Sequence, residues 1–176
     1  MVVEMTVARL GLDSSTNSYV VILQEKHGAR ILPIWIGQPE AESIALQLSQ
    51  IRRERPLTHD LCKSLILALG GTLHRIQITR VVKSTYFADM HIIRGDGTIQ
   101  VDARPSDAIA VALRLSAPIF AAESLLTGDD EEGEEVALEY PGSAADAEQM
   151  EAELRKEQLK AYLENLRPED FGKFSP

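Results

Sequence analysis

Alternating apolar and polar positions predict a series of strands in the first part of the chain. Residues 3–12 alternate with a slip near Ala8, which predicts a half-buried strand with one irregular step. Residues 19–24 and 30–36 are rich in apolar and β-branched side chains around a glycine-containing bend, a pattern typical of a hairpin. Pro33 lies inside the second of these strands. Because proline lacks a backbone N–H, we expect that strand at an edge or a bulge.

Two stretches with helical spacing follow this hairpin. The first is expected over residues 37–51, with Ile44 in its apolar stripe and Ser43 on the opposite, polar face. The second is expected to begin with Thr58 as its N-cap and to end at the glycine pair 70–71. A basic connector separates the two helices.

The second half of the chain repeats this order of elements. A buried helix is expected over residues 108–115, because almost every side chain in it is apolar. Pro105 blocks helical geometry in the residue before it, and Ser106 is expected to be the N-cap. The strands predicted around this helix are residues 72–83, 86–94, 98–102 and 118–121.

The two halves align as an internal repeat. Tyr19, Gly28 and Ile34 lie 67 positions before Tyr86, Gly95 and Val101, and the helices align after a gap of two residues. A supersecondary unit used twice should form one sheet covered by helices. We therefore predict an α+β fold: a duplicated β-β-β-α unit, a mixed sheet with helices packed on one side, and an acidic helical tail.

The acidic charge of the chain belongs to its C-terminal part. The net charge is -9, yet residues 1–126 carry 13 basic and 12 acidic residues, whereas residues 127–176 carry 5 and 15. We expect a domain over 1–127, an acidic flexible linker over 128–146, and a C-terminal helix and tail over 147–176. A nearly neutral domain does not exclude nucleic acid as a partner.

Cellular context is indicated by what the sequence contains. Cys62 is the only cysteine, so no internal disulfide is possible, which suits a reducing cytoplasm. The first residues lack the layout of a signal peptide, and no run of about 18 apolar residues predicts a membrane span. We expect a cytoplasmic protein with no membrane association.

Charged side chains gather at the entrance of the helix that begins near Pro105. Asp102, Arg104 and Asp107 lie within six positions, beside a helix expected to be buried. Because unpaired buried charge is costly, this corner is either a structural ion-pair cluster or a polar site on a rigid element. Both interpretations stay open at this point.

Several ordered motifs together resemble the bifunctional nuclease (BFN) domain family, also known as domain of unknown function 151. They are Leu32-Pro33-Ile34-Trp35-Ile36-Gly37, Glu40-Ala41-Glu42-Ser43-Ile44-Ala45-Leu46, Arg55-Pro56-Leu57-Thr58-His59-Asp60-Leu61, Asp102-Ala103-Arg104-Pro105-Ser106-Asp107-Ala108-Ile109-Ala110 and Pro118-Ile119. The resemblance covers residues 3–126. It implies a duplicated α/β fold, homo-oligomers, and both RNase and DNase activity, which is described for plant members.

Nuclease chemistry gives these motifs expected roles. A bidentate arginine holds phosphate, carboxylates with water hold Mg²⁺ or Mn²⁺, and histidine transfers protons near neutral pH. The catalytic candidates are Asp102, Arg104, Asp107 and His59; the metal candidates are Glu40, Glu42 and Asp60; the substrate-binding candidates are Arg52, Arg53, Arg55 and Lys63. Each group also has a purely structural interpretation: an ion pair, a residue at a helix start, or a solvated connector.

Two functions from different classes follow. The first is a nuclease of low sequence specificity acting on DNA and RNA with a divalent metal. The second is a non-enzymatic oligomeric regulatory or scaffold protein whose charged corner is structural.

Overall fold

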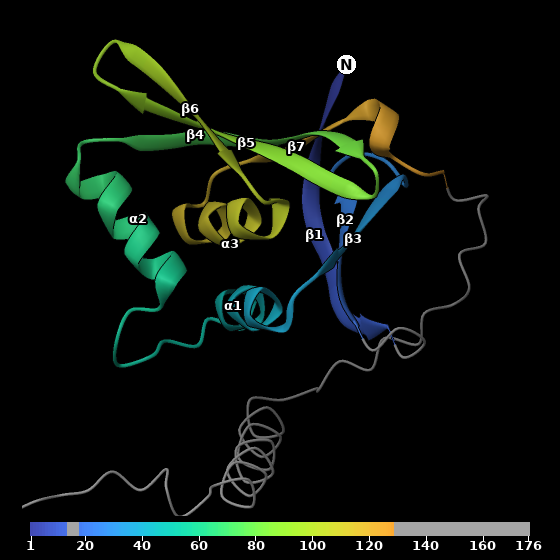
Figure 1. Cartoon of the computed structure of the whole chain (residues 1–176), viewed down its shortest axis with the longest axis horizontal. Helices are drawn as coiled ribbons and strands as arrows, with labels where there is room; N and C mark the ends of the chain where they lie inside the picture. The colour runs from blue at the N-terminus through green and yellow to red at the C-terminus, as the bar shows by residue number, and fades with distance from the viewer. Residues whose placement is uncertain (14–17, 129–176) are drawn as a thin grey trace, which may run out of the picture. The chain divides into compact units, whose positions relative to one another are not determined.

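The computed structural model describes residues 1–13 and 18–128, which form a single seven-stranded mixed sheet with three helices (Figure 1). The strand order is β3-β2-β1-β7-β4-β5-β6. The strands are β1 (Val2–Asp13), β2 (Ser18–Glu25), β3 (Ile31–Ile36), β4 (Thr72–Val82), β5 (Thr85–Arg94), β6 (Gly97–Ala103) and β7 (Ile119–Ala122). The helices are α1 (Gln38–Leu48), α2 (Thr58–Ala68) and α3 (Pro105–Leu115), and a short 3-10 turn, η1 (Glu123–Leu125), follows β7.

The first meander has the two irregularities that its sequence predicts. The pairing of β1 with β2 shifts register between Val7 and Arg9, at the slip beside Ala8. Strand β3 pairs only with β2 among the described strands and is an edge of the sheet, which is where Pro33 costs no hydrogen bond.

The duplication is confirmed by the topology. β1–β2–β3 and β4–β5–β6 are antiparallel meanders, each followed by a helix, α1 or α3. Strand β7 joins them, because it pairs antiparallel with β1 and parallel with β4. Helix α2 lies between the two units and has no counterpart in the repeat.

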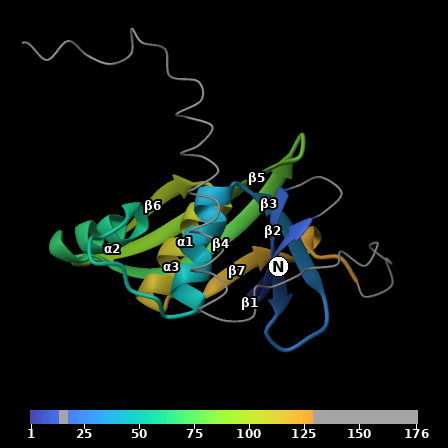
Figure 2. The same ribbon diagram turned by 90° about the horizontal axis from the view of Figure 1, so that it is seen from below.

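The three helices lie on the same side of β4–β6, with α3 in contact with both α1 and α2 (Figures 1 and 2). Helix α3 is buried on almost every side, and Ile109 is fully inaccessible. Its side chains share one core with Leu23, Ile44 and Ile76. The predicted arrangement, a mixed sheet with helices on one side, is therefore correct.

The predicted helix starts are wrong by three residues or fewer. Arg104 is the N-cap of α3 and Pro105 its first residue, so Ser106 lies inside the helix, where it is buried. Leu57, not Thr58, is the N-cap of α2, and its backbone N–H donates to the Asp60 carboxylate of the first turn. In both cases a group on the next turn or a proline sets the start of the helix.

The expected acidic linker and the expected C-terminal helix lie outside the described residues, apart from Gly128. Within the described part of the chain, no helix is long and apolar enough to cross a membrane.

Strand β7 offers a test of how the two units are joined. Ile119 is buried and lies opposite Met5 on one side and Ile76 on the other. We predict that Ile119→Ala lowers the free energy of unfolding by about 2–5 kcal/mol, since it leaves a cavity where both meanders meet. The control is Val81→Ala at an exposed position, which should lower the free energy of unfolding by about 1 kcal/mol or less. Urea unfolding measures both, and equal losses would contradict the role of β7.

Candidate functional site

The predicted charged corner exists and lies on the surface. Arg104 holds Asp107 with two hydrogen bonds, from Nε to Oδ2 at 2.6 Å and from Nη2 to Oδ1 at 3.0 Å. The same Nη2 donates to Oε1 of Glu40 at 2.6 Å. The side chain of Arg104 is 66% exposed, and its Nη1 makes no hydrogen bond within the described residues. The corner therefore links α1 to α3 and still presents the NH2 group of Nη1, with two donors, to solvent.

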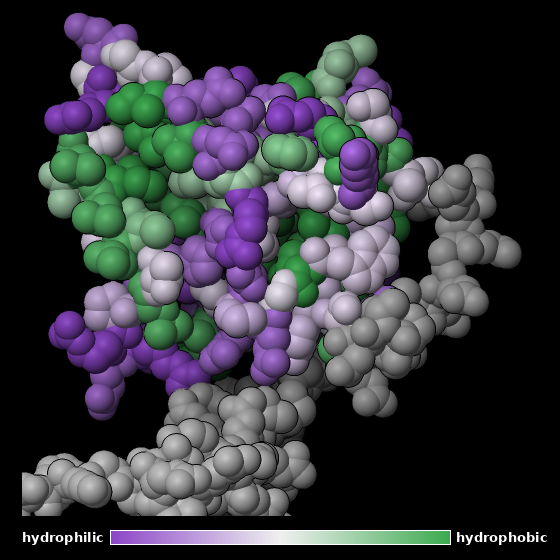
Figure 3. All heavy atoms as spheres, viewed as in Figure 1, coloured by the Kyte–Doolittle hydropathy of each residue, from purple (hydrophilic) through white to green (hydrophobic). Residues whose placement is uncertain are grey.

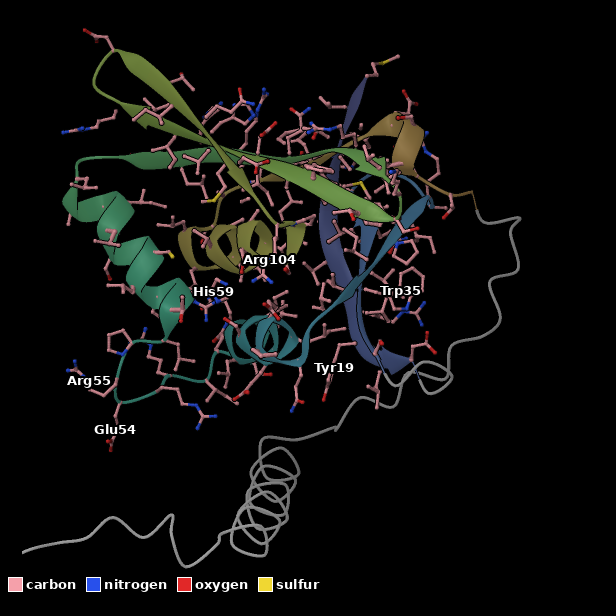
Figure 4. All side chains as sticks on the ribbon, in the orientation of Figure 1. Tyr19, Trp35, Glu54, Arg55, His59 and Arg104 are labelled. Carbon is pink, nitrogen blue, oxygen red and sulfur yellow. The ribbon has the colours of Figure 1, made fainter. Side chains whose placement is uncertain are left out.

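His59 extends this corner into the interior (Figure 4). The ring is buried, with Nε2 3.0 Å from Oδ1 of Asp107 and Nδ1 2.7 Å from Oγ of Ser43. Because an ionised carboxylate only accepts, Nε2 carries the proton, and in the neutral ring Nδ1 accepts the hydroxyl hydrogen of Ser43. Ser43, His59 and Asp107 come from α1, α2 and α3, so this chain of bonds links all three helices.

A second ion pair lies beside the histidine, in the interior. Arg114 of α3 is 7% exposed and donates from Nε to Oδ1 of Asp60 at 2.6 Å. Its other nitrogens donate to the backbone oxygens of Ala110 and Ser43. A buried guanidinium with this many acceptors is well satisfied, so Arg114 fixes the positions of α1 and α2 against α3.

Both paired aspartates have a lowered pKa. Burial raises the pKa of Asp107, but hydrogen bonds from Arg104 and His59 outweigh this effect, and the pKa falls below its ordinary value. For Asp60, burial also raises the pKa, and the bonds from Arg114 and the Leu57 N–H lower it further than burial raises it. Both carboxylates are therefore ionised near neutral pH.

Asp102 does not join this network. It lies on β6 directly opposite Asp89 of β5, and within the described residues it makes no hydrogen bond or ion pair. Strand alternation points it away from the face that carries Val101 and Ala103. Of the four catalytic candidates, the structure brings together Arg104, Asp107 and His59 and leaves Asp102 apart from them.

A cavity of about 730 Å³ lies on the other side of the first turn of α2. Arg52 and Lys63 line it without a carboxylate partner in the described part of the chain, whereas Arg53 lies 3.5 Å from Glu42. Arg55 does not line the cavity and projects from the connector (Figure 4). The whole lining is Leu46, Gln47, Gln50, Ile51, Arg52, Arg53, Glu54, Pro56, Leu57, Asp60, Lys63, Ser64 and Arg114.

The three metal candidates lie in separate ion pairs. Glu40 is paired with Arg104, Glu42 with Arg53 and Asp60 with Arg114. No group of three histidine, cysteine or acidic side chains among the described residues has the arrangement of a metal site.

The sequence pattern missed two residues of this network. Ser43 was expected on the polar, outward face of its helix, but it is buried under His59. Arg114 was overlooked altogether. The signal that could have identified Arg114 is its place as a single charge in an otherwise apolar helix. If that helix is buried, the arginine needs acidic or backbone acceptors from its neighbours.

Removal of Arg114 tests the inner pair. We predict that Arg114→Met lowers the free energy of unfolding by about 1.5–3 kcal/mol, because Asp60 and the backbone oxygens lose a charged hydrogen-bond donor. The exposed Arg55 is the matched control, and Arg55→Met should change stability by about 0.5 kcal/mol or less. Urea titration at neutral pH measures both variants, and a neutral Arg114→Met would contradict the assignment.

The lowered pKa values predict acid sensitivity. The folded state binds protons at Asp60 and Asp107 less readily than the unfolded chain, so their stabilisation is complete above the ordinary pKa. It is lost as pH falls through the lower pKa of the folded state, below about pH 4. Unfolding free energies across this range should fall less steeply in Asp107→Asn than in the unaltered protein. If the two proteins lose stability equally steeply as the pH falls, Asp107 does not contribute to the acid sensitivity.

Comparison with known proteins is consistent with this architecture. The family model described as the bifunctional nuclease domain matches residues 21–133. The chain is 38% identical over 169 residues to an uncharacterized protein of Mycobacterium tuberculosis (strain CDC 1551 / Oshkosh), covering 96% of this chain and 97% of that protein.

Plant proteins are similar over the domain alone. Bifunctional nuclease 1 of Oryza sativa subsp. japonica is 27% identical over 110 residues, which cover 61% of this chain and 33% of the rice protein. Bifunctional nuclease 2 of Arabidopsis thaliana is 26% identical over 106 residues, which cover 58% and 32%. The chain thus spans about a third of the plant proteins' length, and it belongs to the bifunctional nuclease domain family.

Proposed function

We propose that this protein is a nuclease that hydrolyses phosphodiester bonds in DNA and RNA with low sequence specificity. The observation that carries the proposal is the cavity beside α2, in which Arg52 and Lys63 have no acidic partner among the described residues. The names of the plant relatives support the same class of activity.

Phosphate is the ligand that suits these side chains. Unpaired basic groups in a concave site attract the nucleic-acid backbone and release its counterions on binding. Contacts to phosphate position the strand but carry no sequence information. Low sequence specificity follows directly if Arg52, Arg53 and Lys63 make most of the contacts.

The charged corner, with Arg104, Asp107 and His59, is the proposed place of the chemistry. Asp102, which lies on β6 outside this network, is proposed as a further catalytic residue. The free Nη1 of Arg104 is the group available to a phosphate oxygen at this surface. His59 already accepts from Ser43 and donates to Asp107. It can transfer a proton to or from substrate only when one of these bonds opens.

Metal dependence, self-association and location complete the proposal. Mg²⁺ or Mn²⁺ would assist hydrolysis, with Glu40, Glu42 and Asp60 as the candidate ligands, each of which is also paired with an arginine. We further propose a homo-oligomer in the cytoplasm; a single cysteine suits that compartment.

The scaffold function has an observation of its own. Each carboxylate of the corner network, on Glu40 and on Asp107, already has a cationic partner, as a purely structural cluster requires. If the protein is a scaffold, Asp107→Asn would lower the melting temperature, and neither the variant nor the unaltered protein would cleave nucleic acid.

Binding to the cavity can be tested with variants of equal charge. We predict that Arg52→Ala and Lys63→Ala each weaken binding of single-stranded DNA at low salt and reduce the salt slope by about 1. Arg55→Ala removes the same charge from the same connector but outside the cavity, so its effect should be smaller. Fluorescence anisotropy measures all three. Equal losses would indicate diffuse charge attraction in place of a site.

Cleavage tests the corner. Purified full-length protein should degrade single-stranded DNA and RNA with Mg²⁺ or Mn²⁺, and EDTA should stop it. Asp102→Asn and Asp107→Asn should each reduce the rate by at least about tenfold, the lower range for loss of one catalytic group. Activity that persists unchanged in both variants comes from a contaminating nuclease and removes the proposal.

A further inference from the structure

Trp35, the only tryptophan of the chain, lies half exposed on the edge strand β3. Its neighbours Ile34 and Ile36 pack into the core, so strand alternation directs Trp35 to the opposite face of the β1–β3 meander. Figure 4 shows it on the side of this meander that faces away from the helices. The residue is 51% exposed, and an indole left in water on a strand offers a flat apolar surface to a ligand.

The indole is fixed in place by a hydrogen bond that crosses the sheet. Nε1 of Trp35 donates to Oδ2 of Asp13 on β1 at 3.1 Å, and Asp13 is buried. Strand β2 lies between β1 and β3, so the backbones of the two residues are about 10 Å apart across the strands. To reach the carboxylate, the side chain of Trp35 must extend over β2, along the surface of the sheet.

The row of paired residues under the ring leaves room for this arrangement. Trp35 pairs with Val20 of β2 and Val20 with Gly11 of β1, so all three share one face of the sheet. Gly11 has no side chain that would lift the ring away from the strands. Val20 is 3% exposed although it lies outside the main core cluster. One face of the indole is therefore turned to Val20 and the other to solvent.

A cation without an acidic partner lies on the same face. Arg9 pairs with Ile22 and Ile22 with Pro33, which is the next row of residues on this face. Two residues along a strand are about 7 Å apart, a distance that an arginine side chain can span. Arg9 is exposed and makes no hydrogen bond or ion pair within the part of the chain that the structure describes. Single-strand binders combine such a cation with an aromatic surface.

We propose that Trp35 is a stacking platform for an unpaired nucleobase and that Arg9 contacts the adjacent phosphate. We call these two residues the β3 platform. The inference rests on nucleic acid as the substrate in the proposed function, and it names single strands as the preferred form. Bases in a duplex stack on one another and must be unpaired before they can stack on an indole. Every base has a π-face, so stacking agrees with low sequence specificity.

The β3 platform lies next to the charged corner along the chain. Gly37, two residues after Trp35, is the N-cap of α1, and Glu40 in the first turn accepts a hydrogen bond from Arg104. Five residues span at most about 18 Å, which limits the distance between the Cα atoms of Trp35 and Glu40. No other described strand lies outside β3. A single strand of a few nucleotides can therefore pass around this edge and contact both Trp35 and Arg104.

The surroundings of Trp35 favour a nucleobase over an apolar protein surface. Figure 3 shows the largest hydrophobic area over α2 and the β5–β6 hairpin, at the other end of the sheet order from β3. A protein that covered Trp35 with apolar side chains would also remove Arg9 from water without an acidic partner, which is costly. A stacked base brings its own phosphate and supplies that partner.

The single tryptophan makes stacking directly measurable in the full-length protein. We expect a thymidine oligonucleotide of about eight nucleotides, within the range of known site sizes, to quench the emission of Trp35 at low salt in EDTA. An abasic strand of equal length carries the same phosphates and should bind more weakly without quenching. A duplex should leave the emission unchanged. Binding that is detected by fluorescence anisotropy of a labelled thymidine strand, with no change in tryptophan emission, overturns the proposal.

Variants separate stacking from a purely structural role of Trp35. Trp35→Leu should weaken binding of the thymidine strand by about fivefold or more, whereas Trp35→Phe keeps a ring and should stay within about threefold. Arg9→Ala should reduce the salt slope by about 1, and Arg94→Ala, which removes the same charge at the β5–β6 hairpin, should have a smaller effect. Circular dichroism confirms that each variant is folded. Equal affinities of the leucine and phenylalanine variants overturn the proposal.

Cleavage distinguishes this inference from the proposed function. A protein that binds single strands with quenching but cleaves no nucleic acid with Mg²⁺ or Mn²⁺ refutes the nuclease and leaves the β3 platform intact. A protein that cleaves nucleic acid while its tryptophan emission does not respond to bound single strands overturns the β3 platform alone.

Discussion

The hydrogen-bonded network between the three helices is the constraint on which the rest of this structure depends. Arg114 is buried in α3, and a buried guanidinium is tolerated only when acceptors surround it. Those acceptors come from Asp60 of α2 and the backbone of Ser43 in α1. The helices must therefore meet in one arrangement, and His59 and Asp107 are brought together as part of it.

This network divides the charged residues into two classes. Those of the network that face inward, Asp107 and Arg114, are matched donor to acceptor and serve the packing of the helices. Those at the rim, Arg52 and Lys63 in the cavity and Nη1 of Arg104 at the corner, have hydrogen-bonding capacity left for a ligand. A rigid interior with unpaired cations at its border is a suitable platform for phosphate, which the proposed nuclease activity would require.

Local pattern predicted most of the fold. The slip near Ala8, the edge strand with Pro33 and the duplicated unit depend on neighbouring residues or on repeated spacing, and all three are confirmed. Helix starts were less accurate, because Leu57 has no capping side chain of its own and Asp60 supplies the bond.

The site was predictable only in part. Arg104 and Asp107 are three positions apart, so their pairing follows from sequence. Ser43 bonds to His59, 16 residues away in the sequence, and Arg114 bonds to Asp60, 54 residues away. The residue spacing within a single helix cannot predict contacts between helices.

The most direct test of this account is chemical-shift mapping of the ¹⁵N-labelled full-length protein with a short single-stranded oligonucleotide at low salt. We expect the largest changes on the connector and the first turns of α2, around Arg52 and Lys63, with a second group at Arg104. Changes confined to other surfaces, or none at protein saturation, would contradict it.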